Sequence, residues 1–218
     1  MTEDEYLTIA AAGEGEYKEK GSKFISYLVP FSDIALLPDV LHTIGVQHPK
    51  ARHLCYAYRV GIKGDITRSN DDGEPAGTAG KPILNVLYSQ EVSDVFCGVI
   101  RYFGGTKLGA SGLIRAYKSA AEDAFERTDK RVVVVTTDLL ISYRSEDMGL
   151  LYTALKKYGC DTIDQLWEQG PQLKAAVPLS TADDVRKALI AASHGYEVAD
   201  ITDDFISDRI KVEIGRDQ

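Results

Sequence analysis

Glycines and basic residues between Arg101 and Lys118 form the most chemically informative pattern in this sequence of 218 residues. An apolar stretch ends in RYFGGTKLGASG, and a segment with helical periodicity follows. Glycine-rich turns before a helix present backbone N–H groups to anions, and nearby basic side chains add positive charge. We therefore predict an anion-binding or nucleic-acid-binding site with these candidate residues: Arg101, Tyr102, Phe103, Gly104, Gly105, Lys107, Gly109, Ser111, Arg115 and Lys118.

The known nucleotide-binding loops do not fit this segment. Gly104 and Gly109 have the spacing of a phosphate-binding P-loop and Ser111 supplies its hydroxyl, but Ala110 occupies the lysine position. The glycine spacing also differs from that of dinucleotide-binding loops. A structural interpretation stays open beside the functional one, because glycine is the usual residue wherever a turn needs a positive φ angle.

Three acidic residues, Asp71, Asp72 and Glu74, form a second candidate site in the polar segment RSNDDGEPAGTAGKP. Neighbouring carboxylates can hold a divalent cation or act as a general base. Their spacing does not match a calcium-binding loop, however, and the surrounding glycines and Pro75 also suit a solvated turn. We expect no metal site, no cofactor and no catalytic residue here, and we keep the three as an acidic candidate site.

Aromatic residues are frequent near these basic positions: Tyr56, Tyr58, Tyr102, Phe103 and Tyr117. Rings beside a cationic groove often stack on the bases of single-stranded nucleic acid. Buried aromatic residues are also common in any hydrophobic core, and periodicity cannot separate these two interpretations.

Composition limits the class of protein. The formal net charge is −8, but residues 1–131 hold 16 basic against 18 acidic residues, whereas residues 132–218 hold 9 against 15. The first part therefore suits an anionic partner better. No stretch approaches the roughly 18 apolar residues of a membrane helix, and the three cysteines form no CxxC pair. We expect a cytoplasmic protein with reduced thiols and no membrane partner.

Hydrophobic periodicity predicts the elements that position the candidate residues. In the first part we expect strands at 23–31, 53–62 and 95–103, and helices at 33–47, at 82–90 and after the glycine loop. From residue 132 the pattern reads strand 132–143, helix 146–158, two strands joined by a turn at 168–170, a helix from 181, and a strand at 196–201. This second order is β-α-β-β-α-β, that of a ferredoxin-like domain.

Two long motifs then identify a family. The segments RSNDDGEPAGTAGKPIL and VIRYFGGTKLGASGLIRAYKSAA closely resemble, in order and spacing, the paired motifs of the IMPACT family in its bacterial, YigZ-like branch. The resemblance implies an α+β protein. Its domain at 1–131 would resemble the second domain of a small-subunit ribosomal protein, and its ferredoxin-like domain at 132–218 would resemble those late in elongation factor G. Both folds are associated with RNA and the ribosome, although fold analogy alone does not fix a function.

Three functions remain open. The leading hypothesis is a non-enzymatic protein that binds RNA or the ribosome through the glycine loop and modulates translation. The second is a small hydrolase or transferase for a phosphorylated substrate, with the acidic loop facing the glycine loop. The third is an adaptor that binds a protein partner through its acidic second domain.

Overall fold

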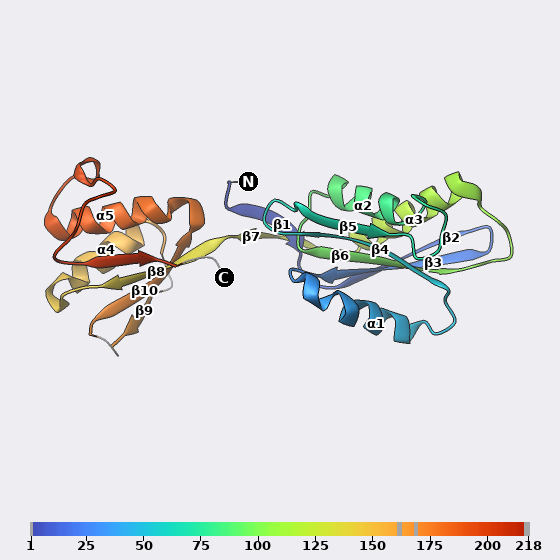
Figure 1. Cartoon of the computed structure of the whole chain (residues 1–218), viewed down its shortest axis with the longest axis horizontal. Helices are drawn as coiled ribbons and strands as arrows, with labels where there is room; N and C mark the ends of the chain where they lie inside the picture. The colour runs from blue at the N-terminus through green and yellow to red at the C-terminus, as the bar shows by residue number, and fades with distance from the viewer. Residues whose placement is uncertain (1, 161–162, 168–169, 216–218) are drawn as a thin grey trace. The chain divides into compact units, whose positions relative to one another are not determined.

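A computed structural model describes residues 2–160, 163–167 and 170–215 (Figure 1). It divides the chain into two compact units. Residues 5–133 form the first, and the second contains the residues from 134 onward together with those before residue 5. Both units combine sheets and helices, which confirms the predicted two-domain α+β fold. In the described ranges, every helix is too short or too polar to traverse a lipid bilayer.

The first unit is built on a five-stranded antiparallel sheet. Its strand order is β2 (Gly13–Glu19), β3 (Ser22–Pro30), β6 (Val95–Tyr102), β4 (His53–Val60) and β5 (Ile66–Asn70). The central strand β6 is buried on both faces from residue 95 to residue 100, as its continuous apolar run requires. The predicted strands at 23–31, 53–62 and 95–103 are confirmed as β3, β4 and β6.

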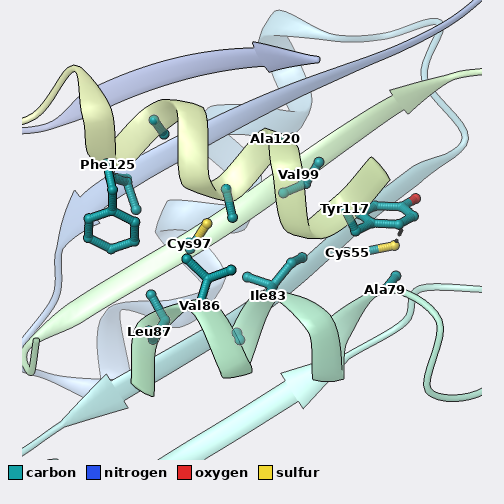
Figure 2. Packing of buried hydrophobic residues seen from close by; sticks show 14 of the residues in the cluster. Cys55, Ala79, Ile83, Val86, Leu87, Cys97, Val99, Tyr117, Ala120 and Phe125 are labelled. Carbon is teal, nitrogen blue, oxygen red and sulfur yellow. Dashed lines mark hydrogen bonds between the residues drawn. The ribbon is translucent and has the colours of Figure 1, made fainter. Parts of the chain in front are cut away.

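Helices cover both faces of this sheet (Figure 1). Helices α2 (Gly80–Ser89) and α3 (Gly109–Glu126) lie on one face, and α1 (Leu37–Gln47), preceded by the 3-10 turn η1 (Ile34–Leu36), lies on the other. Figure 2 shows the main core, where α2 and α3 pack side by side against the sheet. Fully buried residues of this core include Ile83, Val86, Leu87, Cys97, Val99, Tyr117 and Ala120.

Two features of the first unit differ from the sequence-based expectation. Strands β2 and β5 were not predicted, and β1 (Glu5–Ile9) forms a separate two-stranded sheet with β7 (Lys130–Val134). The single strand predicted at 132–143 is wrong, because the chain leaves one sheet after Val134 and enters another at Thr136. An uninterrupted run of β-branched residues conceals that change of sheet.

The second unit contains a four-stranded antiparallel sheet covered by α4 (Met148–Lys157) and α5 (Ala182–His194). The strand order is β11 (Lys211–Ile214), β8 (Thr136–Ser142), β10 (Gln172–Pro178) and β9 (Ile163–Leu166). This is the ferredoxin-like β-α-β-β-α-β order, as predicted. Part of the turn expected at 168–170 lies outside the described residues.

The final strand is the clearest error in the second unit. Residues Val198–Asp200 form a 3-10 turn, η4, where a strand was predicted, and the closing strand is β11. Ile201 is buried at 4% exposure without belonging to a strand. Its apolar side chain reaches the core from a loop, so its hydrophobicity misleads a pattern-based prediction.

Candidate functional site

The glycine-rich loop joins the end of β6 to the start of α3 and borders a pocket of about 730 Å³ in the first unit. The pocket is concave and of mixed character, with basic, aromatic and aliphatic side chains around one carboxylate. Its lining consists of Lys50, Arg52, His53, Glu74, Pro75, Arg101, Tyr102, Phe103, Lys107, Leu108, Gly109, Ala110 and Leu113.

The glycines of the loop are explained by backbone geometry. A Cβ at Gly104 would lie 1.9 Å from the carbonyl carbon of Gly21, so the two backbones approach too closely for any side chain. Gly105 and Gly109 have φ angles of +89° and +71°, which side chains rarely tolerate. The structural interpretation therefore accounts for these three positions, and Gly109 additionally lies on the pocket wall.

The predicted basic residues fall into two groups. Arg101 and Lys107 line the pocket with Tyr102 and Phe103. Arg115 and Lys118 are not part of the pocket lining. Arg115 forms an ion pair with Glu19, and Nζ of Lys118 lies 3.5 Å from Oε1 of Glu122, one helical turn away.

The serine of the loop also stays outside the pocket. Ser111 is exposed in the first turn of α3 but is not part of the lining. Only part of the predicted set therefore converges on one place.

Glu74 joins the two sequence motifs. Its Oε1 accepts a hydrogen bond of 2.6 Å from Nη1 of Arg101 and one of 2.9 Å from the Tyr117 hydroxyl. Both side chains of the ion pair are buried, at 10% exposure for Arg101 and 4% for Glu74. The acidic loop therefore contacts the end of β6, next to the glycine loop, through a carboxylate whose charge Arg101 neutralises.

The thiol of Cys55 contacts Tyr117, the residue that donates to Glu74. Its Sγ is 3.3 Å from the hydroxyl oxygen of Tyr117, as the dashed line in Figure 2 shows. Burial raises the pKa of the Cys55 thiol to about 12, and burial likewise raises the pKa of the Tyr117 phenol well above its ordinary value. Both groups stay protonated at neutral pH, so Cys55 does not provide a nucleophilic thiolate.

Asp71 holds the backbone of its own loop. Its carboxylate accepts hydrogen bonds from the N–H groups of Gly77, Ala79 and Gly80 at 2.8, 3.0 and 2.8 Å, where α2 begins. Burial acts to raise the pKa of this carboxyl, but the three backbone bonds outweigh it and the pKa lies below its ordinary value. Asp71 therefore caps α2 as an anion.

Asp72 fixes the start of β4. Its Oδ2 accepts the Leu54 N–H at 2.6 Å, and its carbonyl oxygen lies 2.6 Å from Nδ1 of His53. Because a carbonyl only accepts, Nδ1 of His53 is the protonated nitrogen. Of the three predicted acidic residues, only Glu74 lines the pocket. Among the residues that the structure describes, no group of three or more His, Cys, Asp or Glu side chains is placed to hold a metal ion.

Sequence reasoning missed the basic residues that enter the pocket from the segment before β4 and from the first residue of β4. Lys50, Arg52 and His53 all belong to the lining. Strands β4 and β6 are antiparallel neighbours, and His53 lies opposite Arg101. The motif HPKARH before a predicted strand was the available signal, but using it required knowing which strands pair.

The aromatic residues divide between core and pocket. Tyr56, Tyr58 and Tyr117 are buried, at 6%, 6% and 0% exposure, so the core interpretation holds for them. Tyr102 lines the pocket, and its hydroxyl lies 2.9 Å from Nδ1 of His48. Phe103 is 59% exposed, which leaves much of its ring free to contact a ligand.

Comparison with known proteins places this site in a family. Residues 20–125, which contain the whole pocket, match the Impact N-terminal domain. An IMPACT family member of Haemophilus influenzae is 31% identical over 193 residues, which cover 88% of this chain and 94% of that protein. YigZ of Escherichia coli is 28% identical over 178 residues, covering 81% and 87% of the two chains.

The strongest local similarity is confined to part of the chain. YvyE of Bacillus subtilis is 47% identical over 118 residues, and this match spans 54% of each protein. A crystal structure described as that of a hypothetical protein superposes with a TM-score of 0.63 at 27% identity, covering 88% of this chain and 94% of the other. The predicted resemblance is confirmed, and this chain belongs to the IMPACT family as a YigZ-like protein.

Proposed function

We propose that this protein binds RNA through the basic pocket of its first unit, without catalysing a reaction, and that it modulates translation in the cytoplasm through RNA of the ribosome. One observation carries the proposal: four cationic side chains, Lys50, Arg52, Arg101 and Lys107, line a pocket whose single acidic side chain is already neutralised. An excess of positive charge in a concave site attracts phosphate groups, although the whole chain is acidic.

Three of the pocket cations have no carboxylate partner, unlike several other cations of the first unit. Lys50, Arg52 and Lys107 are exposed, and within the described ranges none of them lies within ion-pair distance of a carboxylate. Basic residues elsewhere on this unit, including Lys18, Lys23 and Arg127, have carboxylate partners. A cation without a partner stays available to an incoming phosphate.

The start of α3 adds to this positive potential. Leu108 occupies the position before the helix, and its aliphatic side chain cannot accept a hydrogen bond from the first-turn N–H groups. Gly109 and Ala110, the first residues of the helix, line the pocket. The positive end of a helix dipole favours anions at such a place.

Salt-dependent RNA binding tests the proposal. We expect the full-length protein to bind a structured ribosomal RNA fragment in a filter-binding titration, with an affinity that falls steeply as salt rises. Replacing both Arg52 and Lys107 by alanine should reduce the slope of log affinity against log salt by about 1.4 to 1.8, because two phosphate contacts disappear.

A matched control removes the same charge elsewhere. The double variant K63A/R68A alters two exposed cations of the first unit that lie outside the pocket. It should leave the slope unchanged. RNA binding that is absent at low salt, or that both double variants weaken equally, would overturn the proposal.

One observation supports a second candidate, a hydrolase or transferase acting on a phosphorylated substrate. Glu74 brings a carboxylate into the same pocket as the glycine loop, which is the juxtaposition that such an enzyme needs. Asp71 and Asp72 are engaged by backbone N–H groups, so Glu74 would be the general base. Turnover of a phosphate ester that disappears in the Glu74→Gln variant and persists in the Asp72→Asn variant would favour this candidate.

A further inference from the structure

Basic and aliphatic residues both line the pocket, and together they indicate a class of ligand. Lys50, Arg52 and Lys107 carry positive charge, whereas Leu108 and Leu113 are aliphatic. Small-ligand sites are mostly apolar with a few polar groups that fix orientation, and they measure about 300–1,000 Å³. A volume of about 730 Å³ falls within that range. The composition suits a ligand that joins a flat apolar ring to an anionic group.

Arg101, another residue of the pocket lining, provides a second observation. Its side chain is 10% exposed, and its Nη1 donates to Glu74. Its Nε–H has no hydrogen-bond acceptor in the described parts of the chain. Buried donors without acceptors are uncommon in native proteins. That nitrogen is itself buried, so the Nε–H is not the contact we assign to a ligand. Arg101 lines the pocket, and a phosphate there would meet the guanidinium through a charge-assisted hydrogen bond.

Phe103 provides the surface for a ring. It lines the pocket, it is 59% exposed, and the Arg101 guanidinium carbon lies 5.5 Å from its ring centroid. Proteins that bind single strands stack bases on aromatic rings next to cations. A base within a duplex remains paired and stacked, so only an unpaired nucleotide can enter a concave site of this kind.

We infer that the pocket takes one unpaired nucleotide of a single-stranded RNA segment, with the base on Phe103 and the phosphate held by Arg101 and Lys107. The inference rests on the proposed RNA-binding function and deepens it, because it names the part of the RNA that this pocket recognises. It requires that a mononucleotide binds even when the rest of the RNA is absent.

Three small probes separate the two halves of the ligand. Uridine 5′-monophosphate, uridine and ribose 5-phosphate are titrated into the full-length protein, and binding is followed by the NMR shifts of backbone amides. We expect the monophosphate to bind at least 10-fold more tightly than either of the others, since only it occupies both parts of the pocket. The shifted amides should belong to the glycine loop, the start of α3 and the segment before β4.

Variants then assign each half to a residue. Phe103→Ala should weaken the binding of uridine 5′-monophosphate by about 5-fold or more, which is the lower end of the effect of losing one base–aromatic stack. The same variant should leave the affinity for ribose 5-phosphate unchanged. Lys107→Ala should weaken both phosphorylated probes. Tyr88→Ala serves as the control, because Tyr88 is a 47% exposed aromatic residue of the first unit outside the pocket.

The outcomes distinguish this inference from the proposed function. If structured RNA binds with the expected salt slope but uridine 5′-monophosphate causes no shifts in the pocket, the nucleotide inference fails and RNA binding stands. Equal affinity for ribose 5-phosphate and the nucleotide also overturns it, because the base then adds nothing. If the nucleotide binds in the pocket while RNA does not bind, the proposed function fails, the RNA part of the inference fails with it, and the pocket is a site for a free nucleotide.

Discussion

At the level of single residues, the main feature of the candidate site is the buried ion pair between Arg101 and Glu74. A buried charge that loses its partner is costly, typically by about 3–5 kcal/mol, so each residue depends on the other. Tyr117 donates a second hydrogen bond to the same carboxylate oxygen and orients it. The side chains of Arg101 and Glu74 are consequently held in place before any ligand arrives. The exposed cations Lys50, Arg52 and Lys107 remain free to bind a phosphate group.

Asp71 offers a prediction at this scale. Replacing it by asparagine should destabilise the first unit by about 1–2 kcal/mol at pH 7, because a charged helix cap with three backbone hydrogen bonds is weakened. The folded-state pKa of Asp71 is lowered, so its contribution is complete above the ordinary carboxyl value of about 3.9 and is lost as pH falls through the folded-state pKa.

Urea unfolding at a series of pH values measures this effect. The stability difference between the wild type and Asp71→Asn should be constant from pH 7 to pH 5 and should shrink below about pH 4. Asp65→Asn is the control, since that residue is exposed. A difference that grows as the pH falls would contradict the assignment of Asp71 as an anionic cap.

Close packing between a strand and a helix determines the geometry of the first unit at the level of elements. Strand β2 runs directly beneath α3, and a Cβ at Gly15 would lie 2.3 Å from the backbone nitrogen of Ala124. Ser26, on the neighbouring strand β3, donates from Oγ to the carbonyl of Ala120 at 2.5 Å. These contacts hold α3 close to the sheet, and its first turn therefore stays in place on the pocket wall.

Alanine substitutions at two glycines test this packing. Gly15→Ala should destabilise the protein by about 3 kcal/mol or more, because backbone atoms cannot move aside as a flexible side chain can. Gly45→Ala, in α1, should instead stabilise it by about 0.5–1 kcal/mol, since nothing lies within 4 Å of the added Cβ and alanine favours a helix. Chemical denaturation measures both. If Gly15→Ala left the free energy of unfolding unchanged, β2 and α3 would be less closely packed than the structure indicates.

Strands with several buried apolar residues were predicted well, because such burial requires a hydrophobic pattern in the sequence. Some strands without buried residues were missed. Strands β3, β4 and β6 carry the apolar residues of two cores, so their hydrophobic runs are visible in the sequence. Strand β5 has no buried residue, and β11 likewise has none, so neither has a hydrophobic pattern to detect. Edge strands are specified mainly by the backbone of a neighbouring strand, which a local pattern cannot display.

The candidate site was predictable only where its residues lie together in the sequence. Arg101, Phe103 and Lys107 were found because they flank glycines in one short segment. The pairing of Arg101 with Glu74, 27 residues earlier, depends on the tertiary fold. The role of Asp71 was not visible either, because its partners are backbone N–H groups, which are identical in every sequence.

The division of the whole chain is discontinuous. Asp4 belongs to the second unit, where it is buried at 6% exposure. Its Oδ1 accepts the backbone N–H of Ser180 at 2.8 Å, its Oδ2 accepts the Ser180 hydroxyl, and its carbonyl accepts the Val135 N–H at 2.7 Å. The first unit is therefore inserted between two segments of the second.

This arrangement predicts a selective effect of an N-terminal substitution. Asp4→Ala should destabilise the second unit by about 1–3 kcal/mol, because the Ser180 N–H loses its acceptor. Hydrogen exchange measured by mass spectrometry should become faster in β8 and α5 and stay unchanged in β6 and α3. Glu3→Ala, at the adjacent exposed position, is the control. Equal acceleration in both units would show that Asp4 does not belong to the second unit alone.

The bond between Asp4 and Ser180 also affects how the protein is made. The two residues are 176 positions apart, so Asp4 leaves the ribosome long before its partner has been synthesised. At about 5–20 residues per second, the delay is about 10 to 35 s. During that interval residues 5–133 can fold completely, while Asp4 still lacks its Ser180 contacts. Folding of the second unit during translation thus includes the capture of a residue that was synthesised 176 positions earlier.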